Sequence, residues 1–258
     1  SVTGIQISVV KYDSGETVAD WQNAALQNGK FTADITVPQG GWYRLKARAL
    51  NIAGVPTEPV QGIHKWGVGM VILCIGQSNM VGIGLDKPYV EANDLVANYR
   101  NDAWEHLSDP YDKGDTSVAG DGSIGGSMVP TLGNKLVEQY GIPVAFIPCA
   151  KGGTSLLGIH NDWSKRNESN PADRSNLYGN SIYRARAVGG IELIVMNQGE
   201  HDVSDKTPGE DYEKAFRKLF DNYQKDLGYH VPLFYGQLGA SGHSAFVGKD
   251  DVMTGIRT

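Results

Sequence analysis

Three short polar stretches combine the residue types that acyl transfer from an ester requires. Ser78 follows the apolar run of residues 71–75 and a glycine, a position where a serine hydroxyl can act as a nucleophile. The adjacent Gly152 and Gly153 follow a second apolar run, and residues 198–202 follow a third. Glycine lets its backbone N–H approach a ligand closely, and a side-chain amide can donate a hydrogen bond to an oxyanion.

Each stretch by itself also has a plain structural interpretation. Ser78 can cap the helix that follows it, the two glycines can form a tight turn, and Gln198-Gly-Glu-His-Asp202 can be a polar turn. His201 is more simply non-catalytic, because adjacent residues on a turn point in different directions and no second histidine is suitably spaced for a metal.

The apolar runs before these stretches predict the sheet that positions them. Residues 71–75, 142–149, 191–197 and 231–238 are typical of parallel strands buried on both faces. Helices are predicted between them, at residues 128–140, 177–188 and 208–227, and a short extra strand is predicted at 95–99. This alternation predicts an α/β sheet with three layers, whose ligands bind beyond the carboxyl ends of the strands.

The first quarter of the chain has a different pattern. The segments 5–12, 30–37 and 42–50 alternate apolar and polar residues and are separated by turn signals such as Asp13-Ser-Gly15. This period of two residues predicts an antiparallel arrangement. We interpret residues 1–66 as a small immunoglobulin-like β-sandwich, an accessory module, and residues 67–258 as the α/β domain.

Composition excludes several classes of function. The chain has 258 residues and a net charge of −6, so it lacks the excess of basic residues that binding to nucleic acid requires. No nucleic-acid partner is therefore expected. No apolar segment approaches the length of a membrane span. Cys74 and Cys149 are expected to be free buried thiols. The Gly- and Asp-rich excursion between residues 85 and 127 matches no calcium-loop spacing and is expected to shape a binding site.

The three stretches together resemble a known family. Gly76-Gln-Ser-Asn-Met80 looks like the first block of the SGNH hydrolases, in the form of their sialate O-acetylesterase-like and acetylxylan-esterase-like members. Gly152-Gly153 is similar to the second block, and Gln198-Gly-Glu200 is similar to the third block of the acetylesterase branch. The resemblance covers roughly residues 67–258.

This resemblance implies a flavodoxin-like SGNH hydrolase sheet, α/β/α in three layers, and a role for each matching residue. Ser78 would be the nucleophile. The backbone N–H of Ser78, that of Gly153 (or of Gly152) and the amide of Gln198 would form the oxyanion hole. Gln77 and Glu200 would support this site. No metal and no cofactor would be required.

The base is the main departure from the family. SGNH hydrolases carry it near the C-terminus as Asp-x-x-His, and none of the six histidines here has Asp three positions before it. We expect the catalytic His and Asp outside this chain, on a C-terminal continuation or companion fragment of a longer protein. His243 is a weak substitute, and more simply a loop or substrate-contact residue.

The resemblance implies an esterase that removes O-acetyl groups from carbohydrate. It further implies that the substrate is an extracellular glycan and that the protein is secreted or displayed on a cell or phage surface. The alternatives are an esterase or lipase acting on non-sugar esters, and a non-catalytic sugar-binding module on an esterase scaffold. Trp104, Trp163 and Tyr178 are candidates for stacking on sugar faces, and equally for core packing.

Overall fold

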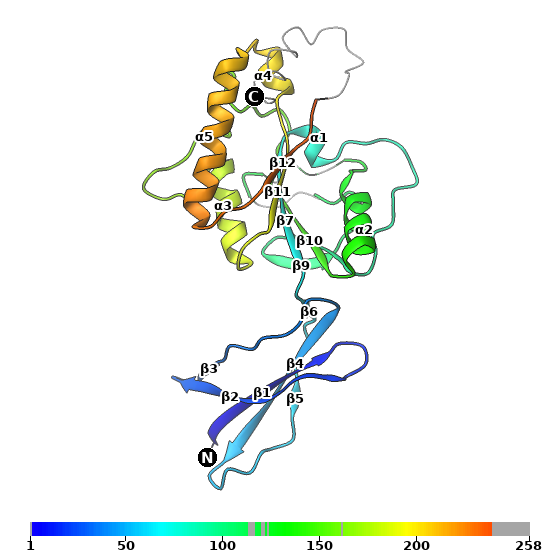
Figure 1. The fold of residues 1–258 in the computed structure, drawn as a ribbon, viewed down its shortest axis with the longest axis vertical. Coiled ribbons are helices and arrows are strands. Elements are labelled where there is room, and N and C mark those ends of the chain that lie inside the picture. Colours follow the sequence, from blue (N-terminus) through cyan, green and yellow to red (C-terminus); the bar gives the residue numbers. More distant parts are fainter. Residues whose placement is uncertain (1, 113–116, 120–121, 123, 161, 239–258) are drawn as a thin grey trace. The chain divides into compact units, whose positions relative to one another are not determined.

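The computed structural model describes residues 2–112, 117–119, 122, 124–160 and 162–238, and divides the chain into two compact units. One unit comprises Ser1–Gly69 with Gln139–Pro143, and the other comprises Met70–Glu138 with Val144–Thr258 (Figure 1). Each unit is described by itself below. No helix within the described ranges is long and apolar enough to cross a membrane.

The N-terminal unit is built from antiparallel strands. They are β1 (Val2–Lys11), β2 (Thr17–Gln27), β3 (Lys30–Thr32), β4 (Trp42–Asn51), β5 (Val60–Gln61) and β6 (Trp66–Gly67). They join in one hydrogen-bonded sheet of order β3-β2-β1-β4-β5, in which β6 also pairs with β4. The predicted strand at 30–37 is shorter than expected, because Ile35 and Val37 pack against the core of this unit from outside any strand. The sandwich and the immunoglobulin-like assignment stay predictions.

The C-terminal unit holds a second, mostly parallel sheet with helices. Its strands are β7 (Met70–Gly76), β8 (Val96–Arg100), β9 (Ala103–His106), β10 (Val144–Pro148), β11 (Leu193–Asn197) and β12 (Leu233–Tyr235). Its helices are α1 (Ser78–Val81), α2 (Val129–Tyr140), α3 (Leu177–Ala187), α4 (Glu200–Ser204) and α5 (Gly209–Leu227). The sheet order is β12-β11-β7-β10-β8-β9, parallel except for the β8–β9 hairpin. The predicted mixed α/β fold is therefore confirmed.

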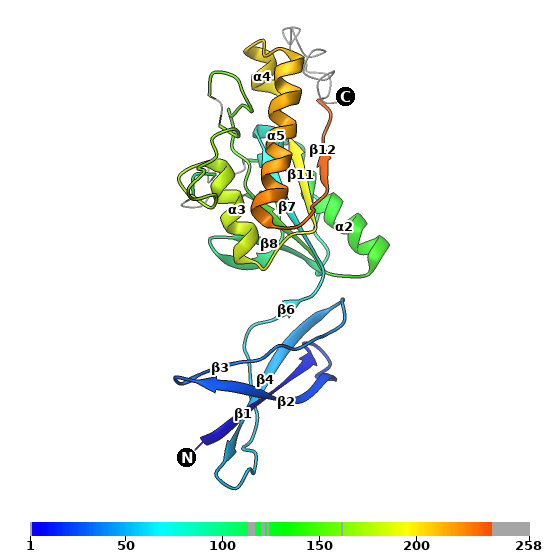
Figure 2. The same cartoon turned by 60° about the vertical axis from the view of Figure 1, so that its left-hand side comes forward.

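Strand β7 lies in the middle of this sheet, and both of its faces are buried. Leu73 and Ile75 pack in a core cluster with residues of α3 and α5, whereas Ile72 and Cys74 pack in another with residues of α2. Figures 1 and 2 show α3 and α5 on one side of the strands and α2 on the other. Burial on both faces explains why residues 71–75 are continuously apolar.

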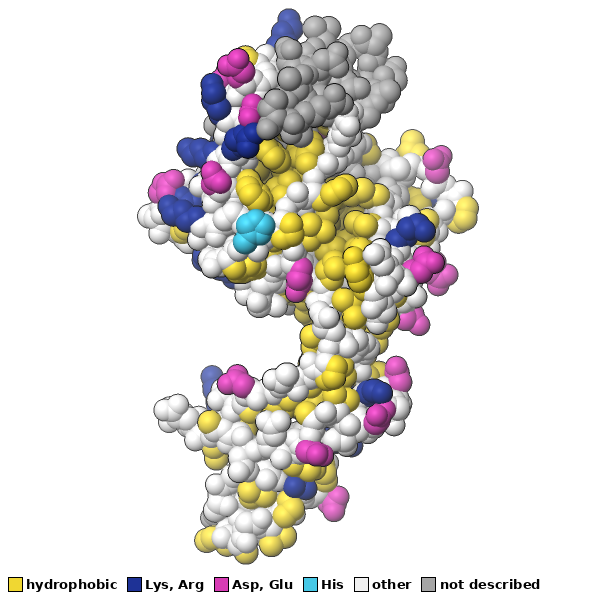
Figure 3. Space-filling view, viewed as in Figure 1, with side chains coloured by type: hydrophobic (Ala, Val, Ile, Leu, Met, Phe, Trp, Pro, Cys, Tyr) yellow, Lys and Arg dark blue, Asp and Glu magenta, His cyan; other side chains and the backbone are white. Residues whose placement is uncertain are grey.

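The predicted helices at 128–140, 177–188 and 208–227 correspond to α2, α3 and α5 within a residue at each end. Helix α5 is amphipathic: its residues Tyr212, Leu219 and Tyr223 are buried against the sheet, and Gly228 ends it in the left-handed conformation. Its outward face carries both basic and acidic side chains, which lie interspersed in Figure 3. The hairpin strand β9 and the short helix α4 were not predicted, and α1 begins at Ser78 itself, with Gln77 at its N-cap.

Candidate active site

Ser78 lies directly beyond the carboxyl end of the central strand β7, as the first residue of α1. It is half-buried, whereas Met80 and Val81 of the same helix are buried. Gly76 makes this turn possible: its φ is +133°, and a Cβ atom there would lie 1.9 Å from the backbone oxygen of Asn197. Only glycine fits so close an approach between two strand ends.

Hydrogen bonds join the ends of the three neighbouring strands. The backbone N–H of Gln77 donates to the oxygen of Asn197 (3.0 Å), and that of Lys151 donates to the oxygen of Gly76 (3.0 Å). The segments that follow β7, β10 and β11 are therefore held at one edge of the sheet. Gly153 has a φ of +73°, is exposed, and has nothing within 4 Å of the position of a Cβ atom. A side chain at this position would therefore meet no neighbouring atom, although the positive φ favours glycine.

Gln198 links these segments from inside. It is fully buried, and its Nε2 donates to Gln77 Oε1 (2.9 Å) and to the backbone oxygen of Thr154 (2.7 Å). A side-chain amide nitrogen has two hydrogens, so both are used by protein acceptors. To donate to an oxyanion, Gln198 has to exchange one of these bonds. In this structure it positions Gln77 and the turn at Thr154.

Glu200 is bonded to the residue after Ser78. Asn79 Nδ2 donates to Glu200 Oε1 at 2.5 Å, which ties α1 to the first residue of α4. The other carboxylate oxygen, Glu200 Oε2, is buried and has no hydrogen-bond partner within the part of the chain that the structure describes. The supporting position expected for Glu200 is thus consistent with its contact to α1.

Asp202 positions a loop of the site, a role that the sequence did not predict. Its buried carboxylate accepts the backbone N–H groups of Leu156 (2.9 Å), Leu157 (2.8 Å) and Gly158 (3.2 Å). Burial raises the pKa of this carboxyl group, and the three N–H groups partly offset that rise. Asp202 thereby holds the loop after Gly153 against α4. In the sequence nothing distinguishes it from an ordinary residue of a polar turn.

The histidines do not complete a catalytic set among the described residues. None of those within the described ranges is hydrogen-bonded to Ser78 Oγ, and His243 lies outside these ranges. His201 has a neighbour that the sequence did not predict: the ring of His160 lies 5.9 Å away, centroid to centroid. Over the described part of the chain, no group of three or more potential ligands is placed to hold a metal ion.

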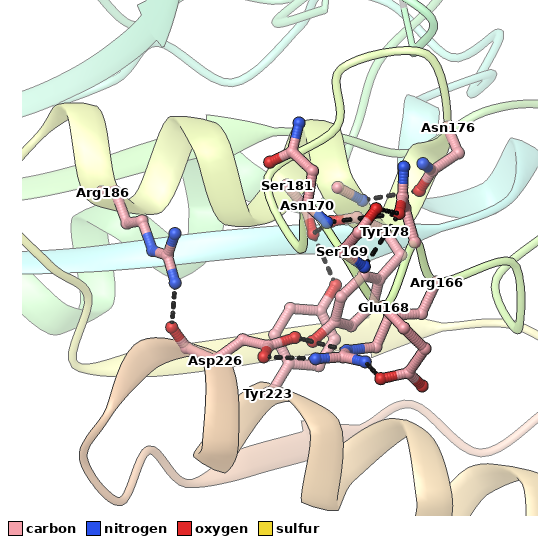
Figure 4. Close-up of polar contacts among 12 residues, drawn as sticks. Arg166, Glu168, Ser169, Asn170, Asn176, Tyr178, Ser181, Arg186, Tyr223 and Asp226 are labelled. Carbon is pink, nitrogen blue, oxygen red and sulfur yellow. Dashed lines mark hydrogen bonds and ion pairs between the residues drawn. The ribbon is translucent and has the colours of Figure 1, made fainter.

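A buried charge cluster anchors the segment between β10 and α3 (Figure 4). Arg166 donates from Nε to Asp226 Oδ2 (2.6 Å) and from Nη2 to Oδ1 (2.7 Å), while Glu168 accepts from its Nη1. Tyr178 donates to the same Asp226 carboxylate at 2.6 Å. Burial alone would raise the pKa of Asp226, but the bonds from Arg166 and Tyr178 outweigh it and lower that pKa.

Two of the proposed sugar-stacking aromatics belong to the core. Trp163 and Tyr178 are 0% exposed, so neither ring can reach a sugar, and that alternative is wrong for both. Trp163 donates from Nε1 to Thr154 Oγ1 (3.3 Å), next to Gln198. Trp104 is 47% exposed and packs against Tyr99.

The cysteine prediction is confirmed, because Cys74 and Cys149 are both free and buried. Burial raises the pKa of each thiol above its usual range. Both are therefore protonated packing residues rather than nucleophiles.

Comparison with known proteins identifies the family. Residues 68–255 match the family described as carbohydrate esterase, sialic acid-specific acetylesterase. No curated protein matches the chain. The structure resembles a protein from Arabidopsis thaliana, with a TM-score of 0.57, 20% identity and coverage of 72% of this chain and 79% of that one. It also resembles a carbohydrate acetylesterase from Xanthomonas citri, with a TM-score of 0.60 and 17% identity.

That second match covers 98% of this chain but 60% of the Xanthomonas protein. At these identities the two structures establish a shared fold. The family match covers more than half of the sequence and includes Ser78, Gly153 and Gln198. The chain therefore belongs to the carbohydrate esterase family of sialic acid-specific acetylesterases.

Proposed function

We propose that this protein is a serine esterase that removes O-acetyl groups from carbohydrate through an acyl-enzyme on Ser78. One observation carries the proposal: Ser78, Gly153 and Gln198 lie on segments that are hydrogen-bonded together at one edge of the sheet. A nucleophile and oxyanion donors have to meet in this way.

In the proposed reaction, Ser78 Oγ attacks the acetyl carbonyl carbon and loses its proton to a histidine base. The backbone N–H groups of Ser78 and Gly153 stabilise the oxyanion that forms. The bond between the carbonyl carbon and the sugar oxygen then breaks, and the sugar oxygen takes the proton from the histidine. Water, activated by the same base, releases acetate from Ser78. Gln198 acts as the third donor if it exchanges one of its present bonds; otherwise it positions Gln77 and Thr154.

We propose that the His–Asp pair lies outside these 258 residues, on a continuation or companion fragment. The exposed edge of the sheet supports this. Among the described strands β12 pairs with β11 alone, Phe234 on β12 is 63% exposed, and hydrophobic side chains gather over this region in Figure 3. A further strand from such a fragment would cover this edge and bring the base with it.

The strand order supports the proposed flavodoxin-like sheet. When β7, β10, β11 and β12 are numbered 1 to 4 along the chain, the sheet order is 2-1-3-4, which is the beginning of the order 2-1-3-4-5. In this proposal the β8–β9 hairpin is an addition at the outer edge of β10, and the fifth strand belongs to the proposed continuation or companion fragment. In the same proposal, residues 1–66 act as an accessory module, and the protein acts outside the cell on glycans.

The test is labelling with a fluorophosphonate followed by intact-mass and peptide mass spectrometry. We expect a single adduct on Ser78 when the purified protein, with any companion fragment, is used, and none in Ser78→Ala. Acetate release from an acetylated oligosaccharide should follow the same pattern. Absence of an adduct on a protein that carries an Asp-x-x-His fragment would exclude the esterase.

A sugar-binding module without catalysis is the second candidate. Two observations favour it: both amide hydrogens of Gln198 are already donated, and no histidine within the described ranges is bonded to Ser78. Binding of an acetylated sugar without any labelling of Ser78 would support this candidate over the esterase.

A further inference from the structure

A cavity of about 420 Å³ begins at Asn79, the residue after Ser78. Its lining comes from α1, from the first part of the 85–127 excursion, from Asp109 and from the residues that lead into α2. This volume lies within the range of small-ligand sites and suits a sugar ring. Asn79 follows the proposed nucleophile in the chain and lies with it on α1.

The walls of this cavity are held in place by hydrogen bonds. Gly84 and Gly126 form an isolated β-bridge, with N–H to oxygen distances of 2.9 and 2.7 Å. Asp109 accepts the backbone N–H of Ser127 (2.9 Å) and its hydroxyl (2.8 Å). The two sides of the cavity are thus linked before any ligand arrives, which lowers the cost of binding.

One wall is aromatic and aliphatic. The half-buried ring of Tyr89 lines the cavity together with Ile83, Val90 and Met128, which are 42%, 47% and 46% exposed. An aromatic ring beside exposed aliphatic groups fits the C–H face of a pyranose, while polar atoms nearby fit its hydroxyl groups. Asn79 and the carboxylates described next supply those polar atoms.

The charge of the cavity is acidic. Asp86 and Asp109 line it, and none of the lining residues that the structure describes is a Lys, Arg or His. Neither carboxylate forms an ion pair in the described part of the chain, because the partners of Asp109 are the neutral groups of Ser127. Lys87 does not line the cavity, and its Nζ lies 5.4 Å from the centroid of the Tyr89 ring.

We propose that this cavity binds the sugar from which acetate is removed, and that it selects a neutral O-acetylated pyranoside over an acidic sialoside. This rests on the proposed function, since it deepens the specificity of the same site. A sialoside brings a carboxylate into a cavity with two carboxylates and no cation among its described lining residues, and like charges at short range repel. The match to a family described as sialic acid-specific therefore assigns the family of this chain, but it does not determine which sugar the chain prefers.

The test measures binding, so that it does not depend on turnover. The full chain carrying Ser78→Ala is titrated calorimetrically with an O-acetylated methyl xyloside, with the methyl glycoside of O-acetylated N-acetylneuraminic acid, and with the methyl ester of that sialoside. The ester has nearly the same size and lacks only the charge. We expect the acid to bind about tenfold more weakly than its ester at low salt, and this difference to shrink as salt screens it.

Two variants test the residues. Asp86→Asn should strengthen binding of the acid about threefold at low salt, whereas Asp221→Asn, an exposed carboxylate of α5 away from the cavity, should leave it unchanged. Tyr89→Ala should weaken binding of the neutral xyloside about tenfold. The control for this loss of an aromatic ring is Tyr140→Ala, which removes a 52% exposed ring outside the cavity.

Equal or tighter binding of the acid than of its ester would overturn the proposal, as would failure of all three sugars to bind or an unchanged affinity in Tyr89→Ala. Fluorophosphonate labelling of the chain with Ser78 intact separates the two hypotheses. Labelling of Ser78 without the expected sugar preference refutes this inference alone. If the protein prefers the neutral sugars but Ser78 is not labelled in the presence of the Asp-x-x-His fragment, the esterase proposal is refuted and the proposed sugar site is retained.

Discussion

Replacing Arg166 by methionine removes the guanidinium that pairs with the buried carboxylate of Asp226. The side chains of Arg166 and Asp226 are 5% and 4% exposed, and two charge-assisted hydrogen bonds of 2.6 and 2.7 Å join them. In Arg166→Met the Asp226 carboxylate keeps only the hydroxyl of Tyr178 as a side-chain donor. A buried charge that loses its partner is strongly destabilising.

The expected loss for Arg166→Met is about 3–5 kcal/mol of the free energy of unfolding, the cost typical of breaking a buried ion pair. Domains of ordinary size have about 5–15 kcal/mol in total, so the C-terminal unit becomes marginal. Asp226→Asn should cost less, because an amide can still accept from Arg166 and Tyr178. The double variant should cost less than the sum of the two, with a coupling of about 0.5–3 kcal/mol.

The assay is urea denaturation read by hydrogen exchange and mass spectrometry of peptides from α3 and α5, because two units need not unfold together. Arg217→Met is the matched control: it breaks the Arg217–Glu213 pair on α5, whose arginine side chain is 59% exposed. This control should change stability by less than about 0.5 kcal/mol.

The pH dependence adds an independent check. Because the folded pKa of Asp226 is lowered, its contribution to stability is complete above the ordinary carboxyl pKa of about 3.9 and is lost as pH falls through the folded value. Asp226→Asn should remove this loss below about pH 4. A cost below about 1 kcal/mol for Arg166→Met, with simple additivity in the double variant, would refute the reasoning.

Three further predictions concern the site. Gly76→Ala should cost about 2–4 kcal/mol, from backbone strain and the clash with Asn197, and thermal unfolding measures it. Gln198→Met removes both bonds from Nε2, including the one to Gln77, and should slow fluorophosphonate labelling of Ser78 about a hundredfold in a time course. Since the folded pKa of Asp202 is raised, the free energy of unfolding should increase as pH falls from neutral through that pKa. Asp202→Asn should flatten this increase, which melting temperatures measured over a series of pH values report. An unchanged slope of melting temperature against pH would contradict the prediction.

Much of the fold could be predicted because its signals are local. Continuous apolar runs predicted the buried strands, and the apolar stripe of α5 predicted a helix that packs on a sheet. The turn after β7 was also predictable, since Gly76 directly follows the apolar run and precedes Ser78 by two residues. By contrast, residues 33–37 alternate like a strand but pack without joining one, because strand pairing depends on which neighbour is available rather than on the pattern alone.

The sequence by itself determined the residue types of the site, their order and the family resemblance that linked them. The tertiary structure decided how those residues are used, because hydrogen bonding and burial depend on groups distant along the chain. Only the fold showed that the amide of Gln198 is engaged with Gln77 and Thr154, and that Asp202 holds the loop after Gly153. Only the fold brought Arg166 to Asp226 across 60 residues of sequence. The acidic cavity that Asn79 lines likewise depends on the pairing of Gly84 with Gly126, which are distant along the chain.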